Sequence, residues 1–372
     1  MSDWPKLDLD NTQQLLATDS QEMLRLTCDY PAQFRLGLQL VRACRLPAGF
    51  PAGGALQRVI VLGTGGGSAA AVQLVRAWLR ADLACPVELV QGYDLPGYAD
   101  EETLCIAISH SGNTEEILTT FAAAGERGCP RLAVTAGGKL AALATAAGVP
   151  VLTIPGGMMP RIAIGLLVPA LVRLLGLTGV APDVISDAGL WDEVGRMLAC
   201  VSADCAPDVP VSDNPAKQLT LAIGQRIPVV YGALDLTWAA ALRWKNQFGE
   251  NSKRLAFWNA VPQLHHDEAV GWEMAPELMS QLAVVALRDA GDSAKIRQRW
   301  DATIELLRPR AGAVLEPKLA GVAGEARLTR LLRQVAVGDF VTIYTALADG
   351  VDPTPVRIID LFKRRLSEAE QS

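Results

Sequence analysis

The sequence predicts an α/β protein built from two doubly wound parallel sheets. Short apolar runs alternate with helical runs between residues 58 and 154. A second alternation of the same kind follows between residues 227 and 347. Turns rich in glycine and hydroxyl residues follow the first and third apolar runs, at 63–68 and 109–114. Strands that alternate with helices form parallel sheets, and such sheets bind ligands beyond the carboxyl ends of their strands.

The bulk composition is that of a globular protein with sizeable cores. The chain has 372 residues, of which 50% are hydrophobic and 20% are charged. This length is enough for two domains. The net charge of −6 argues against a nucleic-acid partner, because nucleic acids require a basic surface. A local basic pocket for a phosphate is compatible with that balance.

The cysteines and the apolar runs of the sequence indicate the cellular compartment of the protein. The seven cysteines are odd in number and lack CxxC spacing, which is typical of a reducing compartment. The polar start at Met1–Pro5 does not resemble a signal peptide. The longest apolar run, 162–177, is interrupted by Pro169 and Arg173 and is shorter than a membrane span, so we expect a buried core helix. We therefore expect a cytoplasmic protein without a membrane partner.

Four regions follow from this pattern. Residues 1–50 are expected to be helical, with Asp19 or Ser20 as a cap, and a Pro/Gly-rich linker follows at 46–54. The first domain, 51–180, should contain strands at 58–62, 86–90, 103–108, 131–135 and 149–154, with helices at 69–80, 115–127 and 140–147.

The second domain is expected to span residues 181–340. A polar junction around a helix at 191–198 should precede strands at 227–231, 255–258, 281–287 and 313–316, with helices at 236–248, 294–307 and 325–347. Residues 341–372 should end in a helix at 355–368 that carries the cations 363–365. Cations near a helix C-terminus are commonly solvated.

The stretch Ser109-His110-Ser111-Gly112-Asn113-Thr114-Glu115-Glu116 lies between an apolar strand and a helix. A helix start offers free N–H groups and a positive dipole end to an anion. The hydroxyls of Ser109, Ser111 and Thr114 can add donors. The alternative is a structural corner in which Asn113 or Thr114 caps the helix. For His110, a polar residue facing the loop is the favoured role.

The glycine-rich turn 63–68 does not match a nucleotide site. Ser68 stands where the last glycine of a dinucleotide fingerprint should be, and no Gly-Lys-Ser/Thr follows. A turn at Gly65 and Gly66 that lets backbone approach an anion or a sugar is favoured over a purely structural turn.

Five motifs carry a resemblance to a known family. The 109–116 stretch resembles the phosphosugar-binding signature of sugar isomerase (SIS) domains. Four further segments resemble the bifunctional phosphoglucose/phosphomannose isomerases of that superfamily, and they are 63–68, 160–165, 244–253 and 262–273. The resemblance runs from Asp19–Leu24 to Thr354–Val356 and Lys363. It implies two flavodoxin-like SIS domains with flanking terminal helices.

The resemblance also implies a set of site residues. The sugar phosphate would bind Gly65, Gly66, Ser68, Ser109, Ser111 and Thr114. Arg161 would offset the negative charge of an enediolate; the alternative is a solvated arginine at a helix start. Glu250 would be the general base, a task that needs a carboxylate with a pKa raised by burial. A glutamate at a helix end is otherwise usually a surface residue.

His266 and Lys363 complete the implied set. The family segment reads Asn-His-Asn-Glu, so His266 matches its ring-opening histidine, while His265 and Asp267 replace the asparagines. Asp267 could fix the tautomer of His266 and raise its pKa. A metal site is disfavoured, because adjacent residues rarely point at one ion. Lys363 aligns with a lysine that assists ring opening, with Arg364 and Arg365 beside it.

Together these features predict an aldose–ketose isomerase that interconverts glucose 6-phosphate or mannose 6-phosphate with fructose 6-phosphate. The family implies a homodimer whose histidine segment reaches the partner's site, and no metal or redox cofactor is required. A sugar-phosphate-binding regulator without catalysis and an isomerase of another sugar phosphate stay open as alternatives. The epimer preference is also open.

Overall fold

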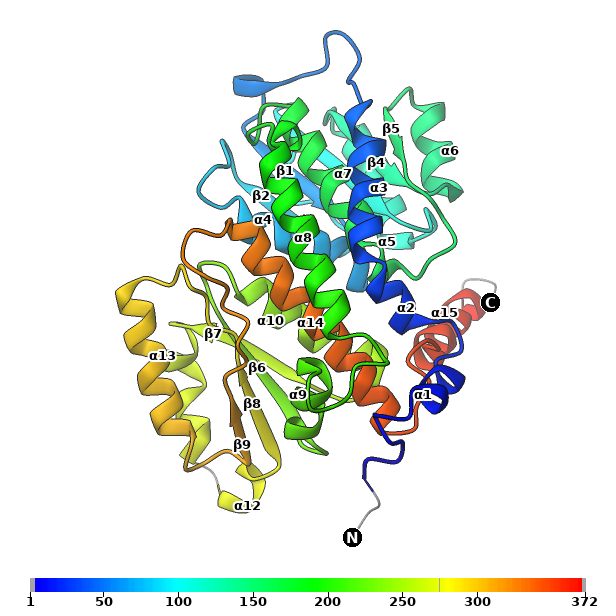
Figure 1. Ribbon diagram of the computed structural model, residues 1–372. Coiled ribbons are helices and arrows are strands. Elements are labelled where there is room, and N and C mark those ends of the chain that lie inside the picture. Colours follow the sequence, from blue (N-terminus) through cyan, green and yellow to red (C-terminus); the bar gives the residue numbers. More distant parts are fainter. Residues whose placement is uncertain (1–3, 274, 370–372) are drawn as a thin grey trace.

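The computed structural model of the chain describes residues 4–273 and 275–369 and contains two parallel β-sheets (Figure 1). The first sheet has the order β2-β1-β3-β4-β5 and the second has the order β7-β6-β8-β9. The first order is that of flavodoxin-like folds, so the predicted fold class is confirmed. The strands are β1 Arg58–Leu62, β2 Val87–Val90, β3 Thr103–Ser109, β4 Arg131–Thr135, β5 Val151–Thr153, β6 Ile227–Ala233, β7 Phe257–Val261, β8 Leu282–Ala286 and β9 Ala313–Leu315.

Helices cover both faces of the first sheet, and the alternation along β1 shows which helix covers which face. Val59 and Val61 belong to a core with α3 (Tyr30–Arg42), α4 (Ala70–Trp78) and α7 (Ile164–Leu177). Ile60 and Leu62 belong to a separate core with α5 (Glu115–Glu126) and α6 (Gly138–Ala146). Successive residues of a strand point to opposite faces, so β1 is buried on both sides.

The second sheet shares one of its two cores with the first. Val230 and Val285 join the same core as α4 and α7, through α10 (Trp238–Gln247) and α14 (Arg327–Ala348). The opposite face packs against α13 (Ala294–Leu307), α11 (Leu264–Asp267) and η6 (Ala269–Glu273). The shared core also holds α8 (Ala188–Asp204) and α9 (Pro215–Ile223). In Figure 1, α8 reaches from the upper half of the molecule down to α14, which runs on beside the second sheet.

Helix α14 is the central helix of the protein. By length and composition alone it could cross a membrane, but 94% of its apolar window is buried inside the protein. It also carries the buried residues Arg330 and Asp339. The shorter apolar helix α7, with Pro169 inside it, is buried as well, which confirms the prediction of a core helix at 162–177.

The terminal regions are helical, as the sequence predicts. Residues 12–42 form α1 (Thr12–Thr18), α2 (Met23–Cys28) and α3. The buried Asp19 carboxylate accepts from the backbone N–H groups of Met23 and Leu24, both at 2.8 Å, and so caps α2. The last helix is α15 (Arg357–Ala369), which is drawn in red at the C-terminal end of the chain in Figure 1. The predicted domain limits stay a prediction, and the limit at residue 340 lies inside α14.

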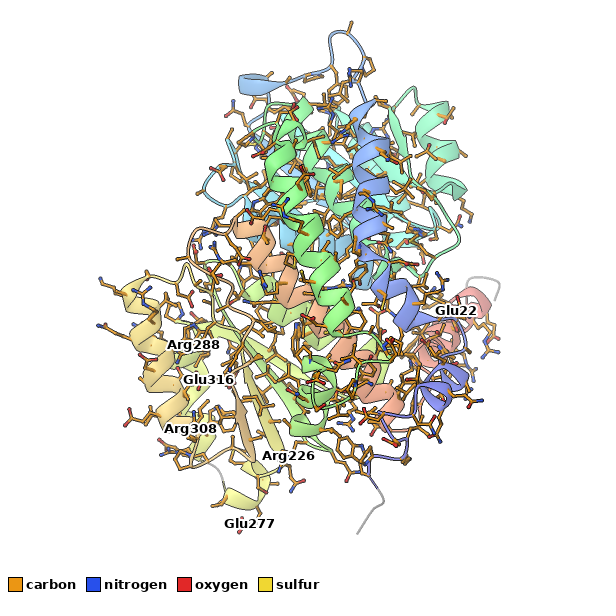
Figure 2. The ribbon with its side chains drawn as sticks, in the orientation of Figure 1. Glu22, Arg226, Glu277, Arg288, Arg308 and Glu316 are labelled. Atoms are coloured by element: carbon orange, nitrogen blue, oxygen red, sulfur yellow. The ribbon has the colours of Figure 1, made fainter. Side chains whose placement is uncertain are left out.

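Four short elements complete the connections, and they are η1 (Gly53–Ala55), η3 (Pro160–Ile162), η4 (Val184–Ser186) and α12 (Pro276–Met279). At the outer edge of the second sheet, Glu316 forms ion pairs with Arg288 and Arg308, each at 3.1 Å (Figure 2). These side chains are 29–63% exposed. Exposed ion pairs contribute at most about 1 kcal/mol, so the packed cores rather than this network hold the second sheet together.

Candidate active site

The glycine-rich turn after β1 is wound into a short π-helical segment, η2 (Gly65–Ala69), that leads directly into α4. Gly65 has a φ of 70°, which favours glycine. Ser68 is buried, and its hydroxyl donates to the carbonyl of Thr64 at 3.0 Å. The Ser68 hydroxyl can still accept a hydrogen bond in this position. The backbone of the turn at Gly65 and Gly66 therefore lies where a ligand at the carboxyl end of β1 would contact it.

Gly66 is the point where the two halves of the site touch. A β-carbon at Gly66 would overlap Oε1 of Glu250 and would lie 3.2 Å from Cβ of Arg161. A side chain at residue 66 would fit only if the Glu250 carboxylate moved from its present position. The turn that follows β1 is thus in direct contact with the carboxylate of Glu250, which follows α10.

The hydroxyl-rich loop after β3 gathers the serine and threonine side chains that the sequence singles out. The hydroxyls of Ser109 and Thr114 lie 3.0 Å apart, and the N–H of Gly112 donates to Ser109 Oγ at 3.1 Å. Thr114 is the N-cap residue of α5, but its side chain makes no cap hydrogen bond. The alternative role of Thr114 is confirmed for its position, since Thr114 is the N-cap residue, but not for a side-chain cap hydrogen bond. The first amides of α5 keep no side-chain cap, as an anion site requires.

Neighbouring segments fix the shape of this loop. Gly112 has a φ of 67°, and a β-carbon there would overlap the carbonyl oxygen of Gly137. The carbonyl of Gly112 accepts from Leu140 N at 2.9 Å, and Asn113 Oδ1 accepts from Lys139 N at 3.1 Å. Strands β1 and β3 are paired, so this loop and the glycine-rich turn leave the same edge of the sheet side by side.

His110 is buried rather than facing the loop, so the favoured role in the sequence analysis is wrong. It is 8% exposed and hydrogen-bonds to the backbone carbonyl of Pro155. Its Nε2 has no partner among the described residues. Burial lowers the pKa of His110, because removal from water costs more free energy for the charged imidazolium than for the neutral imidazole.

Arg161, in the 3₁₀ segment η3, is buried at 2% exposure, which excludes the solvated alternative. Its Nε donates to Asn251 Oδ1 at 2.8 Å, and its Nη2 donates to the carbonyls of Pro353 and Thr354 at 3.0 and 2.9 Å. Burial lowers the pKa of Arg161, yet a guanidinium stays protonated in proteins. This cation is therefore held rigidly by oxygen acceptors from two distant segments.

Glu250 lies in the π-helical segment η5 (Phe248–Ser252), which continues α10. Its carboxylate is 23% exposed and lies 3.6 Å from Nη1 of Arg161. Its neighbours Asn251 and Ser252 are buried and anchor the segment to Thr342 on α14. Glu250 is thus a half-buried carboxylate on a rigid segment rather than a surface residue.

A cavity of about 1140 Å³ opens in front of this carboxylate. Gly65, Gly66 and Glu250 line it from the two sheets, and Ile358 and Ile359 line it from the first turn of α15. The volume exceeds what one sugar phosphate fills, since small-ligand pockets span roughly 300–1,000 Å³. The lining contains no histidine, and the 109–114 loop contributes none of its described residues to it.

Lys253 lines the same cavity, and the sequence analysis did not single it out. It has a φ of 57°, and its ammonium donates to the carbonyls of Glu250, Asn251 and Pro353 at 2.7, 3.1 and 2.7 Å. Partial burial, and secondly the charge of Arg161, lower its pKa to about 8, although the residue as a whole is exposed. Its place three residues after Glu250 in a recognisable motif was the available signal.

The histidine pair does not reach this cavity within the chain. His266 is exposed on α11, and Asp267 pairs with Gln263 at 2.9 Å and Asn259 at 3.4 Å instead of with His266. His265 packs against α13, where Nδ1 lies 2.9 Å from Arg299 and Nε2 lies 2.7 Å from Thr303 Oγ1. The expected Asp267–His266 pair is therefore wrong, and His265 has the structural partners.

Lys363 is likewise exposed, on α15, while the first turn of the same helix lines the cavity. Among the residues that the structure describes, no group of three His, Cys, Asp or Glu side chains could hold a metal ion. The chain therefore brings the Glu250 carboxylate together with the Arg161 guanidinium and the Lys253 ammonium. Further charged residues line the same cavity, and they are Lys245, Arg254, Asp352 and Arg357.

Comparisons with known proteins agree with this geometry. Residues 212–366 match the family described as "Bacterial phospho-glucose isomerase C-terminal SIS domain". A bifunctional phosphoglucose/phosphomannose isomerase of Caldicellulosiruptor bescii is 36% identical over 84% of this chain and 90% of its own length. The enzyme of the same name from Aquifex aeolicus is 32% identical over 82% and 88%.

Solved structures support the fold. A putative phosphosugar isomerase from Clostridium difficile has a TM-score of 0.65 at 14% identity and covers 91% of this chain and 97% of its own. A glucose-6-phosphate isomerase-like protein from Thermus thermophilus has a TM-score of 0.60 at 20% identity, covering 96% and 99%. With its two SIS-type sheets and its curated relatives matched over most of their length, the chain belongs to the family of bifunctional phosphoglucose/phosphomannose isomerases.

Proposed function

We propose that the protein is a sugar-phosphate isomerase that interconverts glucose 6-phosphate and mannose 6-phosphate with fructose 6-phosphate through a cis-enediolate. The observation that carries this proposal is the placement of Glu250 3.6 Å from Arg161, in the lining of a cavity beside a glycine-rich turn. A carboxylate can take a proton from C2 and return it to C1, and a fixed cation next to it offsets the charge that develops on the oxygens.

The phosphate is assigned to the two turns at the edge of the first sheet. Ser109 and Thr114 direct their hydroxyls to one point, and the first amides of α5 have no side-chain cap. Ser68 and the backbone of Gly65 and Gly66 lie on the neighbouring turn, with Ser111 on the loop itself. Hydrogen bonds from backbone and hydroxyl donors to a phosphate dianion are charge-assisted and therefore strong.

Binding at this edge would place the carbons C1 and C2 toward Glu250. Arg161 keeps its guanidinium fixed through Asn251, Pro353 and Thr354, so it needs no reorganisation as the enediolate forms. The substrate carbonyl itself acidifies the neighbouring C–H bond, so the chain's residues need only move protons and stabilise charge.

Ring opening requires a proton donor near the ring oxygen, and we assign it to His266 of a second subunit, with Lys363 assisting. Both side chains are exposed in the single chain. Large apolar residues before and within β7 and on α15 are also exposed, with Leu255 at 80%, Phe257 at 56% and Phe362 at 65%. Exposed apolar patches of this kind mark association surfaces, and an isologous pair would supply each site with the other chain's histidine.

The same reasoning covers the setting in which the enzyme works. All seven cysteines are free, which supports a reducing compartment and hence the cytoplasm. The substrates would place it at the entry of hexose phosphates into glycolysis and, in the reverse direction, in gluconeogenesis. No nucleic-acid or membrane partner is invoked.

A coupled assay tests the proposal. Purified protein is given glucose 6-phosphate or mannose 6-phosphate, and the appearance of fructose 6-phosphate is followed. We expect turnover with both epimers, and a control with glucosamine 6-phosphate shows whether the amino sugar is also accepted. Tight binding of these phosphates with no fructose 6-phosphate formed from either would favour a regulator that binds sugar phosphates without converting them.

A further inference from the structure

A buried arginine outside the cavity reaches both groups that Glu250 contacts. Arg243 lies on α10 and is 1% exposed. Its Nη1 donates to the backbone carbonyl of Gly66 at 3.1 Å, and its Nη2 donates to the backbone carbonyl of Arg161 at 2.8 Å. The guanidinium of Arg243, on a helix that packs beside the second sheet, therefore holds two backbone segments that follow strands of the first sheet.

The charge of Arg243 is balanced on α14. Nε and Nη2 donate to the carboxylate of Asp339 at 3.0 and 2.7 Å, and Gln247 donates to the same carboxylate at 3.1 Å. The hydroxyl of Tyr30, on α3, also hydrogen-bonds to Asp339. Helices α3, α10 and α14 thus converge on one buried ion pair, and removal of either partner would leave an uncompensated buried charge.

The same helix determines where Glu250 stands. Residues 238–247 of α10 run without a break into η5, so Arg243 and Glu250 belong to one continuous helical segment. Arg243 fixes the distance from that segment to Gly66 and Arg161, while Glu250 touches Gly66 and faces Arg161 at 3.6 Å. The positions of the Glu250 carboxylate, the Gly66 turn and the Arg161 cation therefore all depend on the same buried residue, Arg243.

We propose that Arg243, paired with Asp339, is a positioning residue that sets the spacing between Glu250 and the Gly66–Arg161 side of the site. The inference rests on the proposed function for its catalytic consequence, because proton transfer is sensitive to that spacing. A displacement of about 1 Å can cost about 10²-fold in rate. Arginine is required because its planar fork reaches the carboxylate and two carbonyls at once, whereas a lysine ammonium cannot span them.

The test compares Arg243→Lys with Arg330→Lys. Arg330 is a matched control, since it is also a buried arginine paired with an aspartate, with Nε 2.7 Å from Asp289, but it lies in the first turn of α14 and does not line the cavity. Both variants keep the charge and lose the fork. For Arg243→Lys we expect kcat for fructose 6-phosphate to fall about 100-fold with KM within about threefold, whereas Arg330→Lys should keep both constants.

Hydrogen exchange gives a readout that does not depend on turnover. Backbone amides of 63–70 and 158–165 should exchange faster in Arg243→Lys and should be unchanged in Arg330→Lys. If Arg243→Lys proves too unstable to purify, Tyr30→Phe removes a neutral hydrogen-bond partner of Asp339 and Arg243 without unpairing a buried charge, and it should show the same two changes to a smaller degree. Wild-type kcat in Arg243→Lys, or equal losses in both arginine variants, would overturn the inference. An inactive wild type would refute the proposed function, while the exchange comparison would still decide whether Arg243 holds the two segments.

Discussion

The carboxylate of Glu250 and the guanidinium of Arg161 lie 3.6 Å apart, although Arg161 lies in η3, after the last strand of the first sheet, and Glu250 lies in η5, after α10 beside the second sheet. Arg161 is almost fully buried and is held by three oxygen acceptors, while Glu250 retains 23% exposure toward the cavity. The cation is therefore fixed and the carboxylate remains accessible. This asymmetry is what a proton shuttle beside a charge-stabilising group requires.

Gly66→Ala tests the contact between the two sheets. The new methyl group would overlap Glu250 Oε1, so the carboxylate must rotate away from the position it now holds. We expect kcat to fall by about 10²-fold because the misplaced base no longer meets C2, with the melting temperature little changed. Gly54→Ala is the control, since nothing lies within 4 Å of its β-carbon position. Equal activity of both variants would show that the Gly66 contact has no role.

The double variant Ser109→Ala/Ser111→Ala tests the phosphate assignment. It removes two hydroxyl donors, and charge-assisted hydrogen bonds contribute about 1.5–3 kcal/mol each. We expect KM for the sugar phosphate to rise at least about tenfold with the fold intact. Ser212→Ala, a serine outside the site, serves as the control. An unchanged KM in the double variant would refute the phosphate site.

Mixing two inactive variants tests whether His266 acts across subunits. Glu250→Gln and His266→Ala should each be nearly inactive as homodimers. After co-refolding, about half of the dimers are mixed and each has one site with both wild-type residues, so about a quarter of wild-type activity should return. His265→Ala should keep activity, because its ring packs on Arg299 and Thr303. No recovery on mixing, together with a single-subunit mass in size-exclusion chromatography, would contradict the shared site.

His110 predicts a pH dependence of stability. Burial lowers the pKa of His110 below its ordinary value in the folded protein. The unfolded chain then binds more protons as the pH falls through about 6.5, so this contribution to stability is complete above that pH and is lost below it. His110→Gln should flatten the fall in the free energy of unfolding between about pH 7.5 and about pH 5, measured by urea titration. Parallel curves for variant and wild type would show that His110 does not titrate differently on folding.

The sequence predicted the sheets better than the site. Strands 58–62 and 131–135 and the helix 294–307 were predicted to the residue, because buried apolar runs and helical periodicity are local signals. The strand expected at 255–258 is found at Phe257–Val261. Leu255 is apolar but 80% exposed beside the cavity, so an apolar residue at the surface was mistaken for a core residue.

The site depended on contacts that no local pattern encodes. The burial of Arg161 comes from Asn251 and from residues 353–354, which follow it by 90 and more positions. The hydrogen bond from Arg243 to the carbonyl of Gly66 joins residues 177 positions apart. Likewise, Asp267 beside His266 suggested a pair by adjacency, but the geometry of α11 directs Asp267 to Gln263. Motif resemblance identified the residues, and only the fold shows which of them meet.

Exchange of solvent deuterium into C2 of glucose 6-phosphate tests the central claim most directly, because it follows the proton that Glu250 is proposed to move. The wild-type protein should incorporate deuterium at C2, and Glu250→Gln, which keeps the shape but cannot accept a proton, should lose exchange and turnover together by about 10²–10⁴-fold. Glu277→Gln changes an exposed glutamate on α12 (Figure 2) and should exchange normally. Wild-type exchange in Glu250→Gln would contradict the account, since another residue would then be the base.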